Sequence, residues 1–546
     1  MAEKMSDFAH SIMLQKYSHT LADGTKETWE QIAARVAKSV LENTPAAHLV
    51  PEVETAIRER KFLPGGRYLY ASGRDFHQTQ NCLLLRAEDS REGWADLLHK
   101  ATMALMTGAG IGVDYSDVRP KGSLVKRTGG FATGPTSLMQ MVNEAGRHIM
   151  QGGARRSAIW AGLSWRHKDV LDFVKLKDWP EEMRRTKEKD FNAYATLDGT
   201  NISVTLDKEF FDAYHDWSHE KHQQAQDVYW QTVRHMLSSA EPGFSVDYDN
   251  PRESLRNACT EVVSEDDSDI CNLGSINLAR VNTLEEFQRL VHLGTVFLLA
   301  GTLYSDLPYE RVAEVRTKNR RLGLGLMGVH EWLLQRGKEY GEDWELEDWL
   351  RVYETDSRKT ADETADAWGV SRPLKVRAIA PTGTIGIVAE TTTGIEPLFC
   401  VAYQRRYKGT DGQSTQYQYV VDPCAKRLID LGVDPALIED AYTLAEDVER
   451  RVAFQAWVQG FVDQSISSTI NLPAWGSALN NESRVQAFGE MLLKYLPRLR
   501  GITCYPDGSR GGQPLVPVAY EEAVKHVGQV FYEQADLCDL SKAGSC

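Results

Sequence analysis

The spacing of apolar residues predicts a helical N-terminal region followed by alternating strands and helices. Over 28–41 the apolar residues recur every three or four positions, which is typical of an amphipathic helix, and we expect helices throughout 6–60. The Pro-Gly-Gly sequence at 64–66 ends this region. Beyond it, the short apolar run at 81–85 predicts a buried strand, and 92–107 predicts a helix that leads through a glycine-rich turn into another strand.

Strands and helices continue to alternate in the next part of the chain. The stretch at 120–157 is rich in Gly, Lys and Arg and contains a helix predicted over 135–150. The five elements predicted after it are 158–163, 168–176, 201–206, 208–216 and 226–239. This alternation favours an α/β architecture with parallel strands. No repeat or linker divides the chain, and the periodicity is lost after about residue 511.

The composition indicates a globular protein without a general attraction to polyanions. The 546 residues are 42% apolar and 25% charged, and the formal net charge of −15 disfavours nucleic acid and anionic lipid as partners. The longest apolar stretch, near 291–304, is too short to span a bilayer, and the N-terminus does not resemble a signal peptide. Eight cysteines without a repeated pattern indicate a reducing cytoplasm rather than a disulfide scaffold.

One cysteine has polar neighbours at regular spacing. Asn257 and Glu261 flank Cys259, and Cys271 follows twelve positions later. A single cysteine is most often a small buried hydrophobic residue. In extended backbone, however, residues 257, 259 and 261 would lie on one side, where an amide and a carboxylate beside a thiol can exchange protons with a polar substrate. The spacing alone leaves both interpretations open.

The chain lacks the sequence patterns of common metal sites. It has no Cys-x-x-Cys, no His-Glu-x-x-His and no pair of Glu-x-x-His motifs, so we predict neither a zinc site nor a di-iron centre of its own. The segment 323–328 matches the dinucleotide fingerprint Gly-x-Gly-x-x-Gly. Four basic side chains in 315–321 argue against the strand that must precede this fingerprint. We interpret these glycines instead as allowing close helix packing.

Two further segments are candidates for binding an anion. The turn at 380–386 is rich in threonine and glycine and follows an apolar stretch at 376–379 that predicts a strand. Free N–H groups at the start of a helix attract phosphate, although an ordinary strand–helix turn is the alternative. The loop at 151–157 places two glycines beside two arginines, which is typical of a solvated basic loop or of a mobile phosphate- or base-binding loop.

Taken in order, these segments resemble the large catalytic chain of ribonucleotide reductases, from about residue 20 to 515. The matching motifs are Gly-Ile-Gly at 110–112, the 151–157 loop, Asn-x-Cys-x-Glu at 257–261, Cys-Asn-Leu-Gly-Ser-Ile-Asn-Leu at 271–278, the segment 320–328, Pro-Thr-Gly-Thr-Ile at 381–385, Gly-Ile-Glu-Pro at 394–397, Gly-Ile-Thr at 501–503 and Asp-Gly-Ser-Arg at 507–510. The resemblance implies a ten-stranded α/β barrel of two antiparallel halves, each of five parallel strands, around a central finger loop. It implies an N-terminal helical region at 1–60, the catalytic barrel at 61–510 and a C-terminal tail with redox cysteines at 511–546.

The resemblance also implies roles for the residues around Cys259. Cys259 would carry a transient thiyl radical and take the 3′-hydrogen of the ribose, with Glu261 as general base at the 3′-hydroxyl and Asn257 hydrogen-bonded to the substrate. Cys82 and Cys271 match the pair that donates two electrons and becomes a disulfide while the 2′-hydroxyl leaves as water. The residues that match the substrate-phosphate turn are Thr382, Gly383, Thr384 and Ile385.

Regulation and re-reduction are implied by further matches. The residues that match the region for a deoxynucleotide effector, and the loop that would carry its message to the substrate base, are Asp89, Lys126, Arg127, Arg155 and Arg156. Cys538 and Cys546 match tail thiols that exchange with the active-site disulfide and are reduced by a thioredoxin- or glutaredoxin-type protein. We expect a homodimer built on the effector site, and no room for an extra N-terminal ATP-binding module.

The classes of this family differ in how the cysteine radical is made. One class receives it from a separate metal-containing subunit through adjacent tyrosines, whereas Tyr505 here follows Cys504 and has no tyrosine beside it. The short spacing from Cys259 to Cys271 and the Tyr-Pro-Asp-Gly-Ser-Arg segment at 505–510 resemble the adenosylcobalamin-dependent class II, in a compact viral-type form. The C-terminal region lacks the motif of the glycyl-radical class.

We therefore predict a cytoplasmic reductase, in the host cytoplasm if viral, that uses adenosylcobalamin to convert ribonucleoside di- or triphosphates to deoxyribonucleotides. The main alternative is the catalytic subunit of a class I enzyme with a separate metal radical subunit. An inactive relative that only binds nucleotides is a further alternative, against which the intact set of predicted catalytic residues argues.

Overall fold

A ten-stranded mixed sheet forms the centre of the protein. The computed structural model describes residues 5–126, 129–151, 155–189, 193–408, 415–509 and 515–532. The strands of this sheet are, in spatial order, β1 (Phe62–Pro64), β11 (Asp269–Asn277), β2 (Cys82–Arg86), β3 (Gly110–Asp114), β6 (Ile159–Ser164), β7 (Thr200–Asp207), β8 (Gly243–Asp247), β16 (Gly501–Pro506) and β15 (Thr469–Leu472), and β12 (Leu322–Met327) also pairs with β11.

The sheet contains two sets of parallel strands that run in opposite directions. Strands β2, β3, β6, β7 and β8 are parallel to one another. Strand β12 is parallel to β11, and β15 is parallel to β16. The two sets meet at the antiparallel pairs β2–β11 and β8–β16. The predicted α/β class with parallel strands is therefore confirmed.

The pairing of these strands does not close the sheet into the predicted barrel, because β12 and β15 do not pair with each other. Between them lies the segment 376–379, which was predicted to be a strand and forms only isolated bridges to Leu324 and Ile466. The Asp463 carboxylate accepts the backbone N–H groups of Val376 at 3.0 Å and of Arg377 at 2.8 Å. These two N–H groups therefore do not form the hydrogen bonds of a regular β-strand.

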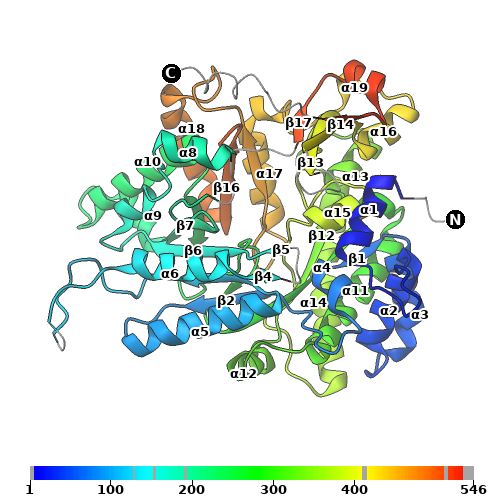
Figure 1. The fold of residues 1–546 in the computed structure, drawn as a ribbon, viewed down its shortest axis with the longest axis horizontal. Helices are drawn as coiled ribbons and strands as arrows, with labels where there is room; N and C mark the ends of the chain where they lie inside the picture. The colour runs from blue at the N-terminus through cyan, green and yellow to red at the C-terminus, as the bar shows by residue number, and fades with distance from the viewer. Residues whose placement is uncertain are drawn as a thin grey trace, which may run out of the picture.

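Helices cover both sides of the sheet. The helices of the described residues are α1 (Asp7–Lys16), α2 (Trp29–Leu41), α3 (Val50–Arg58), α4 (Gly66–Ala71), α5 (Arg91–Thr107), α6 (Pro135–Arg147), α7 (Val170–Val174), α8 (Glu181–Lys189), α9 (Lys208–His215), α10 (His222–Ser239), α11 (Leu284–Tyr304), α12 (Glu310–Asn319), α13 (Val329–Gln335), α14 (Trp344–Trp368), α15 (Gly383–Ala389), α16 (Pro423–Asp430), α17 (Val448–Gln459), α18 (Val485–Tyr495) and α19 (Tyr520–His526). In Figure 1, α5, α6, α9 and α10 lie on the left of the molecule and α2, α3, α11 and α14 on the right.

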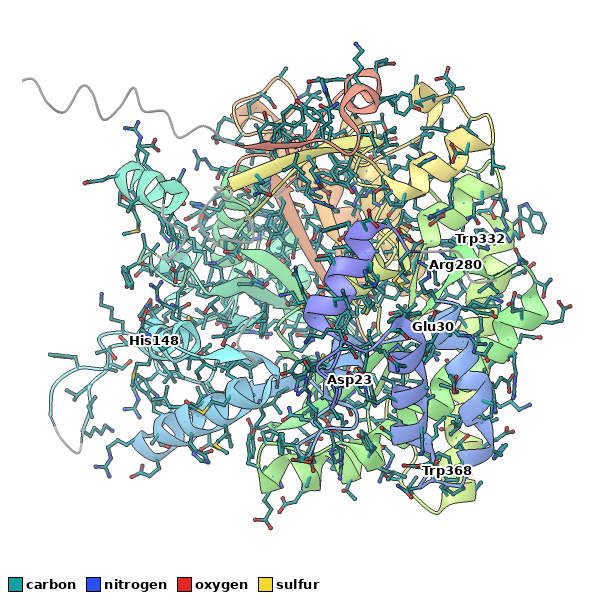
Figure 2. The ribbon with its side chains drawn as sticks, turned by 45° about the vertical axis from the view of Figure 1, so that its right-hand side comes forward. Asp23, Glu30, His148, Arg280, Trp332 and Trp368 are labelled. Atoms are coloured by element: carbon teal, nitrogen blue, oxygen red, sulfur yellow. The ribbon has the colours of Figure 1, made fainter. Side chains whose placement is uncertain are left out.

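Two large hydrophobic cores form, one on each side. The first contains buried residues of α2, α3, α11 and α14, and Figure 2 labels Trp332 from this core. The predicted N-terminal helix is confirmed as α2, which Thr28 caps together with Gln31. The second core contains buried residues of β2, β3, β6, β7 and α10. No helix within the described residues combines the length and apolar character needed to cross a membrane.

The glycines at 323–328 allow strands, not helices, to approach closely. This segment forms most of β12, so our interpretation of close helix packing is wrong. A Cβ at Gly323 would lie 2.8 Å from the Asn272 carbonyl oxygen, and one at Gly325 would lie 2.6 Å from that of Ala378. The alternating glycines therefore allow β12 to fit between β11 and the segment 376–379, a packing that helical periodicity did not indicate.

A second, smaller sheet lies at the top of the molecule in Figure 1. It has four strands in the order β17 (Leu515–Pro517), β13 (Ala402–Lys408), β14 (Thr415–Val421) and β18 (Val530–Tyr532). The described part of the predicted tail, 515–532, thus contributes two strands and α19. The predicted tail cysteines, Cys538 and Cys546, lie outside the described residues.

Candidate active site

Cys259 lies at the tip of a short hairpin. Its two strands, β9 (Leu255–Arg256) and β10 (Val263–Ser264), pair antiparallel. The backbone N–H of Thr260 donates to the Asn257 carbonyl at 3.1 Å, and the N–H of Val262 donates to the Asn257 side chain at 3.0 Å. The expected extended backbone is therefore wrong: the chain turns here, with Thr260 at φ +67°. The turn leaves Cys259 exposed while Asn257 and Glu261 are buried.

Two glycines of β3 allow the hairpin to lie directly against the sheet. A Cβ at Gly112 would lie 1.9 Å from the carbonyl oxygen of Arg256, and one at Gly110 would lie 3.0 Å from the Cβ of Ala258. Any side chain at 112 would therefore collide with the backbone of the hairpin. This close approach explains the Gly-Ile-Gly motif and fixes the height of Cys259 above the strands.

Cys82 and Cys271 are direct partners across two strands. They are opposite each other in the antiparallel pair β2–β11. Residues opposite each other in such a pair have Cα atoms about 4.5–5.5 Å apart, which lies within the range of disulfides. Both are thiols in this structure. Burial raises the pKa of both thiols, so they stay protonated.

The two thiols belong to a third, small cluster between the large cores. Its members are Cys82, Leu84, Leu255, Val262, Cys271, Leu273, Ala378 and Ala380. Successive residues of β2 point to opposite faces of the sheet, so Cys82 and Leu84 lie in this cluster whereas Leu83 and Leu85 lie in the second large core. The cluster includes residues of both hairpin strands or their flanks, so it connects the cysteine pair to the loop that carries Cys259.

Glu261 connects the hairpin with the cysteine pair. The Cys82 thiol donates to Glu261 Oε1 at 3.9 Å. Burial raises the pKa of Glu261 to about 7, although hydrogen bonds from Asn257 and Cys82 oppose the shift. The other carboxylate oxygen, Oε2, is buried and finds no hydrogen-bond partner among the described residues. A buried acceptor of this kind is costly unless a partner arrives, and a substrate hydroxyl is such a partner.

The predicted phosphate turn begins next to the same cluster. Ala378 and Ala380 pack with the two cysteines, and α15 starts three residues later at Gly383. Gly383 and Thr384 are exposed, whereas Thr382 and Ile385 are buried. The hydroxyl of Thr382 accepts the N–H of Gly394 at 2.8 Å, so this side chain stabilises the turn. Space is open at Gly383, where an added Cβ would meet no atom within 4 Å.

The predicted effector residues are only partly described. Asp89 accepts two hydrogen bonds from Arg119 Nε, at 2.7 and 3.0 Å, and Lys126 is exposed. The sequence did not single out Arg119. Strand β5 (Arg155–Arg156) pairs with β4 (Met150–Gln151) in a short hairpin. The predicted residue Arg127 lies outside the described residues.

Sequence reasoning missed a polar group behind the cysteine pair. Arg321 donates to Asp269 at 2.5 Å, and both side chains are completely buried. Gln464, also buried, donates to the Leu322 carbonyl at 2.7 Å and contributes a hydrogen bond that lowers the pKa of Cys271. The only sequence signal for Arg321 was its place in the matched 320–328 segment, where a basic pair is usually exposed.

Comparisons with known proteins find relatives over most of the chain. The family model described as "Ribonucleotide reductase, barrel domain" matches residues 80–254, 220–355 and 369–496. A vitamin B12-dependent ribonucleoside-diphosphate reductase of Mycobacterium tuberculosis is 28% identical over 566 residues, covering 91% of this chain and 78% of the relative. The corresponding protein of Thermoplasma acidophilum is 26% identical, covering 94% and 72%. A putative adenosylcobalamin-dependent ribonucleoside-triphosphate reductase of Mycobacterium phage D29 is 24% identical, covering 74% and 76%.

Proposed function

The chain belongs to the ribonucleotide reductase family, and we propose that it reduces ribonucleotides to 2′-deoxyribonucleotides with adenosylcobalamin as the radical source. The observation that carries the proposal is the combination of an exposed thiol, Cys259, with a buried carboxylate and a cross-strand thiol pair. The names of the bacterial, archaeal and phage relatives support the choice of cofactor.

The first step of the proposed reaction takes place at Cys259. Its sulfur, as a thiyl radical, takes the 3′-hydrogen of the ribose, while Glu261 accepts the proton of the 3′-hydroxyl and Asn257 holds the substrate. A pKa of about 7 suits Glu261 to this exchange, because a catalytic base works best when its pKa lies near the operating pH. The unpartnered Oε2 supplies the acceptor that the 3′-hydroxyl needs.

The second step uses Cys82 and Cys271 as the donor of two electrons and two protons. The 2′-hydroxyl takes one proton of the pair and leaves as water, C2′ gains the other hydrogen as the two sulfurs join as a disulfide, and Cys259 returns the first hydrogen to C3′. Protonated thiols suit this step, and burial keeps both thiols protonated.

The surroundings of Cys259 fit an adenosylcobalamin-dependent enzyme. Its thiol is exposed at the hairpin tip while the residues beside it are buried, so a large group can reach the sulfur from one side. Adenosylcobalamin, when bound, supplies the one-electron oxidation that removes the hydrogen atom of the thiol. Tyr505 on β16 follows Cys504, so the chain offers no adjacent tyrosine pair for a radical passed on from another subunit.

We further propose that the sheet closes into a ten-stranded barrel around the hairpin. One half would be β2, β3, β6, β7 and β8, and the other β11, β12, the segment 376–379, β15 and β16. Support comes from backbone hydrogen bonds on both sides of this segment: Ala378 donates to Leu324 at 3.1 Å, and Ile379 donates to Ser465 at 3.2 Å. The helical region would span 1–60, the barrel 61–510 and the tail 511–546.

The proposal also includes an effector site, a substrate-phosphate site and a pair of tail cysteines. A cytoplasmic homodimer would bind a deoxynucleotide effector near Asp89, where Arg119 supplies a cation. The substrate phosphates would bind at 382–385. Cys538 and Cys546 would reduce the active-site disulfide by exchange and would be regenerated by a thioredoxin- or glutaredoxin-type protein.

The decisive experiment supplies adenosylcobalamin as the sole radical source. Each ribonucleoside di- and triphosphate is incubated with the protein, a dithiol and adenosylcobalamin, and the deoxynucleotide is quantified. We expect product with the wild-type chain and none with Cys259→Ser. Product that requires an added iron or manganese subunit would favour the class I alternative. Nucleotide binding without product under either condition would favour an inactive relative.

A further inference from the structure

A buried cation lies beside one thiol of the redox pair and not beside the other. Asn272 of β11 pairs with Leu322 of β12 in parallel register, so the preceding residues, Cys271 and Arg321, are also neighbours. Asp269, which binds Arg321 at 2.5 Å, lies two residues before Cys271 and therefore on the same face of β11. Cys271 thus has a guanidinium group at its side.

One nitrogen of this guanidinium group has no hydrogen-bond acceptor among the described residues. Arg321 Nε donates to Asp269, and Nη2 donates to Ser264 at 3.2 Å. Nη1 is buried and finds no acceptor among the described residues. In the reduced protein the Cys271 thiol donates to the Asn272 carbonyl at 3.3 Å. An anion formed on Cys271 would be the acceptor that Nη1 lacks, and such charge-assisted hydrogen bonds are strong.

A glycine keeps the space next to Cys271 open. A Cβ at Gly323 would lie only 3.3 Å from Cys271 Sγ. Arg321 also lies near Glu253, but that carboxylate already binds Lys375 at 2.8 Å and Arg500 at 3.2 Å. The carboxylates around Arg321 therefore have other partners as well, and the charge of Arg321 still acts on Cys271, whose pKa burial raises and Arg321 lowers.

Cys82 has the opposite surroundings. Burial raises the pKa of this thiol, and the Glu261 carboxylate, which accepts its S–H, raises it further. The side chain of Cys82 is 3% exposed and that of Cys271 is 0% exposed. Cys82 is thus the slightly more accessible residue of the pair, and Cys271 is the residue next to the buried cation.

We propose that Arg321 makes Cys271 the leaving sulfur when the Cys82–Cys271 disulfide is reduced, so that the incoming thiolate always bonds to Cys82. The inference rests on the proposed function, which produces this disulfide. The thiolate of a dithiol reductant forms a bond to Cys82 Sγ, the Cys82–Cys271 bond breaks, and its electron pair stays on Cys271 as a thiolate facing Nη1. The second thiol of the reductant then releases Cys82 and leaves as the oxidised disulfide, and both cysteines regain protons.

The size of the effect follows from the influence of a cation on a thiol. An opposite charge within about 4–6 Å shifts a pKa by about 1–3 units. Rates of thiol–disulfide exchange rise as the pKa of the leaving thiol falls, and a sensitivity of about one half is typical of this reaction. Loss of the Arg321 charge should therefore slow reduction of the disulfide by roughly 3- to 30-fold.

The first test identifies the sulfur that is attacked. The full-length protein is oxidised with diamide, exposed to 2-mercaptoethanol, and trapped with N-ethylmaleimide before peptide mass spectrometry. We expect mercaptoethanol on Cys82 and maleimide on Cys271. An equal mixture, or mercaptoethanol mainly on Cys271, would overturn the proposal. Absence of a Cys82–Cys271 disulfide after oxidation would overturn it together with the proposed redox pair.

The second test removes the charge without leaving a lone buried carboxylate. The double variant Arg321→Met with Asp269→Asn should slow reduction within the range above and weaken the preference for Cys82, whereas Arg321→Lys should keep the preference. The matched control is Arg60→Met with Glu390→Gln, which removes another buried ion pair, joined at 2.9 Å, that includes neither Arg321 nor Asp269. Equal slowing in both double variants would show a merely structural role.

These outcomes separate the inference from the proposed function. Diamide supplies the oxidation, so the site of attack is measured without any nucleotide turnover. A protein that reduces no ribonucleotide but is attacked only at Cys82 would contradict the proposed function and leave the role of Arg321 in place. A protein that reduces ribonucleotides but is attacked at Cys271 would contradict the inference alone.

Discussion

Protonation of Glu261 should set the pH dependence of turnover. Burial raises the pKa of this carboxyl group from its ordinary 4.5 to about 7. The difference corresponds to roughly 3 kcal/mol, because each pKa unit is worth about 1.36 kcal/mol. As a general base, Glu261 must be ionised to accept the proton of the 3′-hydroxyl. We therefore expect kcat/KM to fall as the pH falls through about 7, the pKa of this group.

The assay is a pH profile of kcat/KM with adenosylcobalamin and a dithiol in excess, at constant ionic strength. Glu261→Gln should lower kcat/KM by about 10²–10⁴-fold, which is the usual contribution of general base catalysis, and its residual activity should lack the midpoint. Glu261→Asp is the matched control, because it keeps an ionisable group near the same place. A wild-type midpoint near 4.5, or a midpoint near 7 that persists in Glu261→Gln, would refute the reasoning.

The same shift affects stability, which gives an independent check. A carboxyl group whose pKa is raised on folding stabilises the folded chain when it is protonated. This contribution is fully present below about 4.5 and is lost as the pH rises through about 7, to a total of roughly 3 kcal/mol. The Glu261→Gln variant has no carboxyl group to ionise and cannot lose this contribution. The thermal midpoint of the variant minus that of the wild type should therefore be larger in alkaline than in acidic buffer. A difference that does not depend on pH would contradict the shift.

Three further predictions concern the hairpin, the radical source and the redox pair. Gly112→Ala should lower turnover by about 10²-fold, because the new Cβ would lie 1.9 Å from the Arg256 carbonyl oxygen and would displace the hairpin. The control Gly341→Ala should leave turnover unchanged, because a Cβ there would lie no closer than 3.9 Å to another atom. Tyr505→Phe should retain turnover with adenosylcobalamin, and its loss would point to a tyrosine relay. Cys82→Ser should yield no deoxynucleotide with a dithiol, and sustained product formation would refute its place in the donor pair.

Local patterns were enough to predict several elements in the first half of the chain. The apolar spacing over 28–41 became α2, and the short apolar run at 81–85 became β2, because each depends on residues near in sequence. The segment 376–379 failed to form a regular strand because Asp463, far along the chain, takes its N–H groups. The glycines at 323 and 325 were misinterpreted for the same reason, since their neighbours come from β11 and from Ala378.

The site was predictable only as far as its residues carry a sequence motif. Spacing suggested the set around Cys259, but not that the chain turns there, which leaves the thiol exposed and Glu261 buried. The pairing of Cys82 with Cys271 follows from a strand register that joins residues almost two hundred positions apart. Arg321 had no predictable role, because its partner Asp269 becomes visible only when β12 is placed beside β11.

Burial of the cysteine pair creates two opposing requirements, and the surroundings of the two sulfurs differ in a way that meets both. Reduction of the substrate needs protonated thiols, and burial in an apolar cluster keeps Cys82 and Cys271 protonated. Regeneration needs a thiolate to leave, which the same burial opposes. A cation beside both sulfurs would ionise the donors and weaken the first step. In the proposed reaction, a cation beside Cys271, with a carboxylate beside Cys82, would help Cys271 to leave while Cys82 keeps its proton.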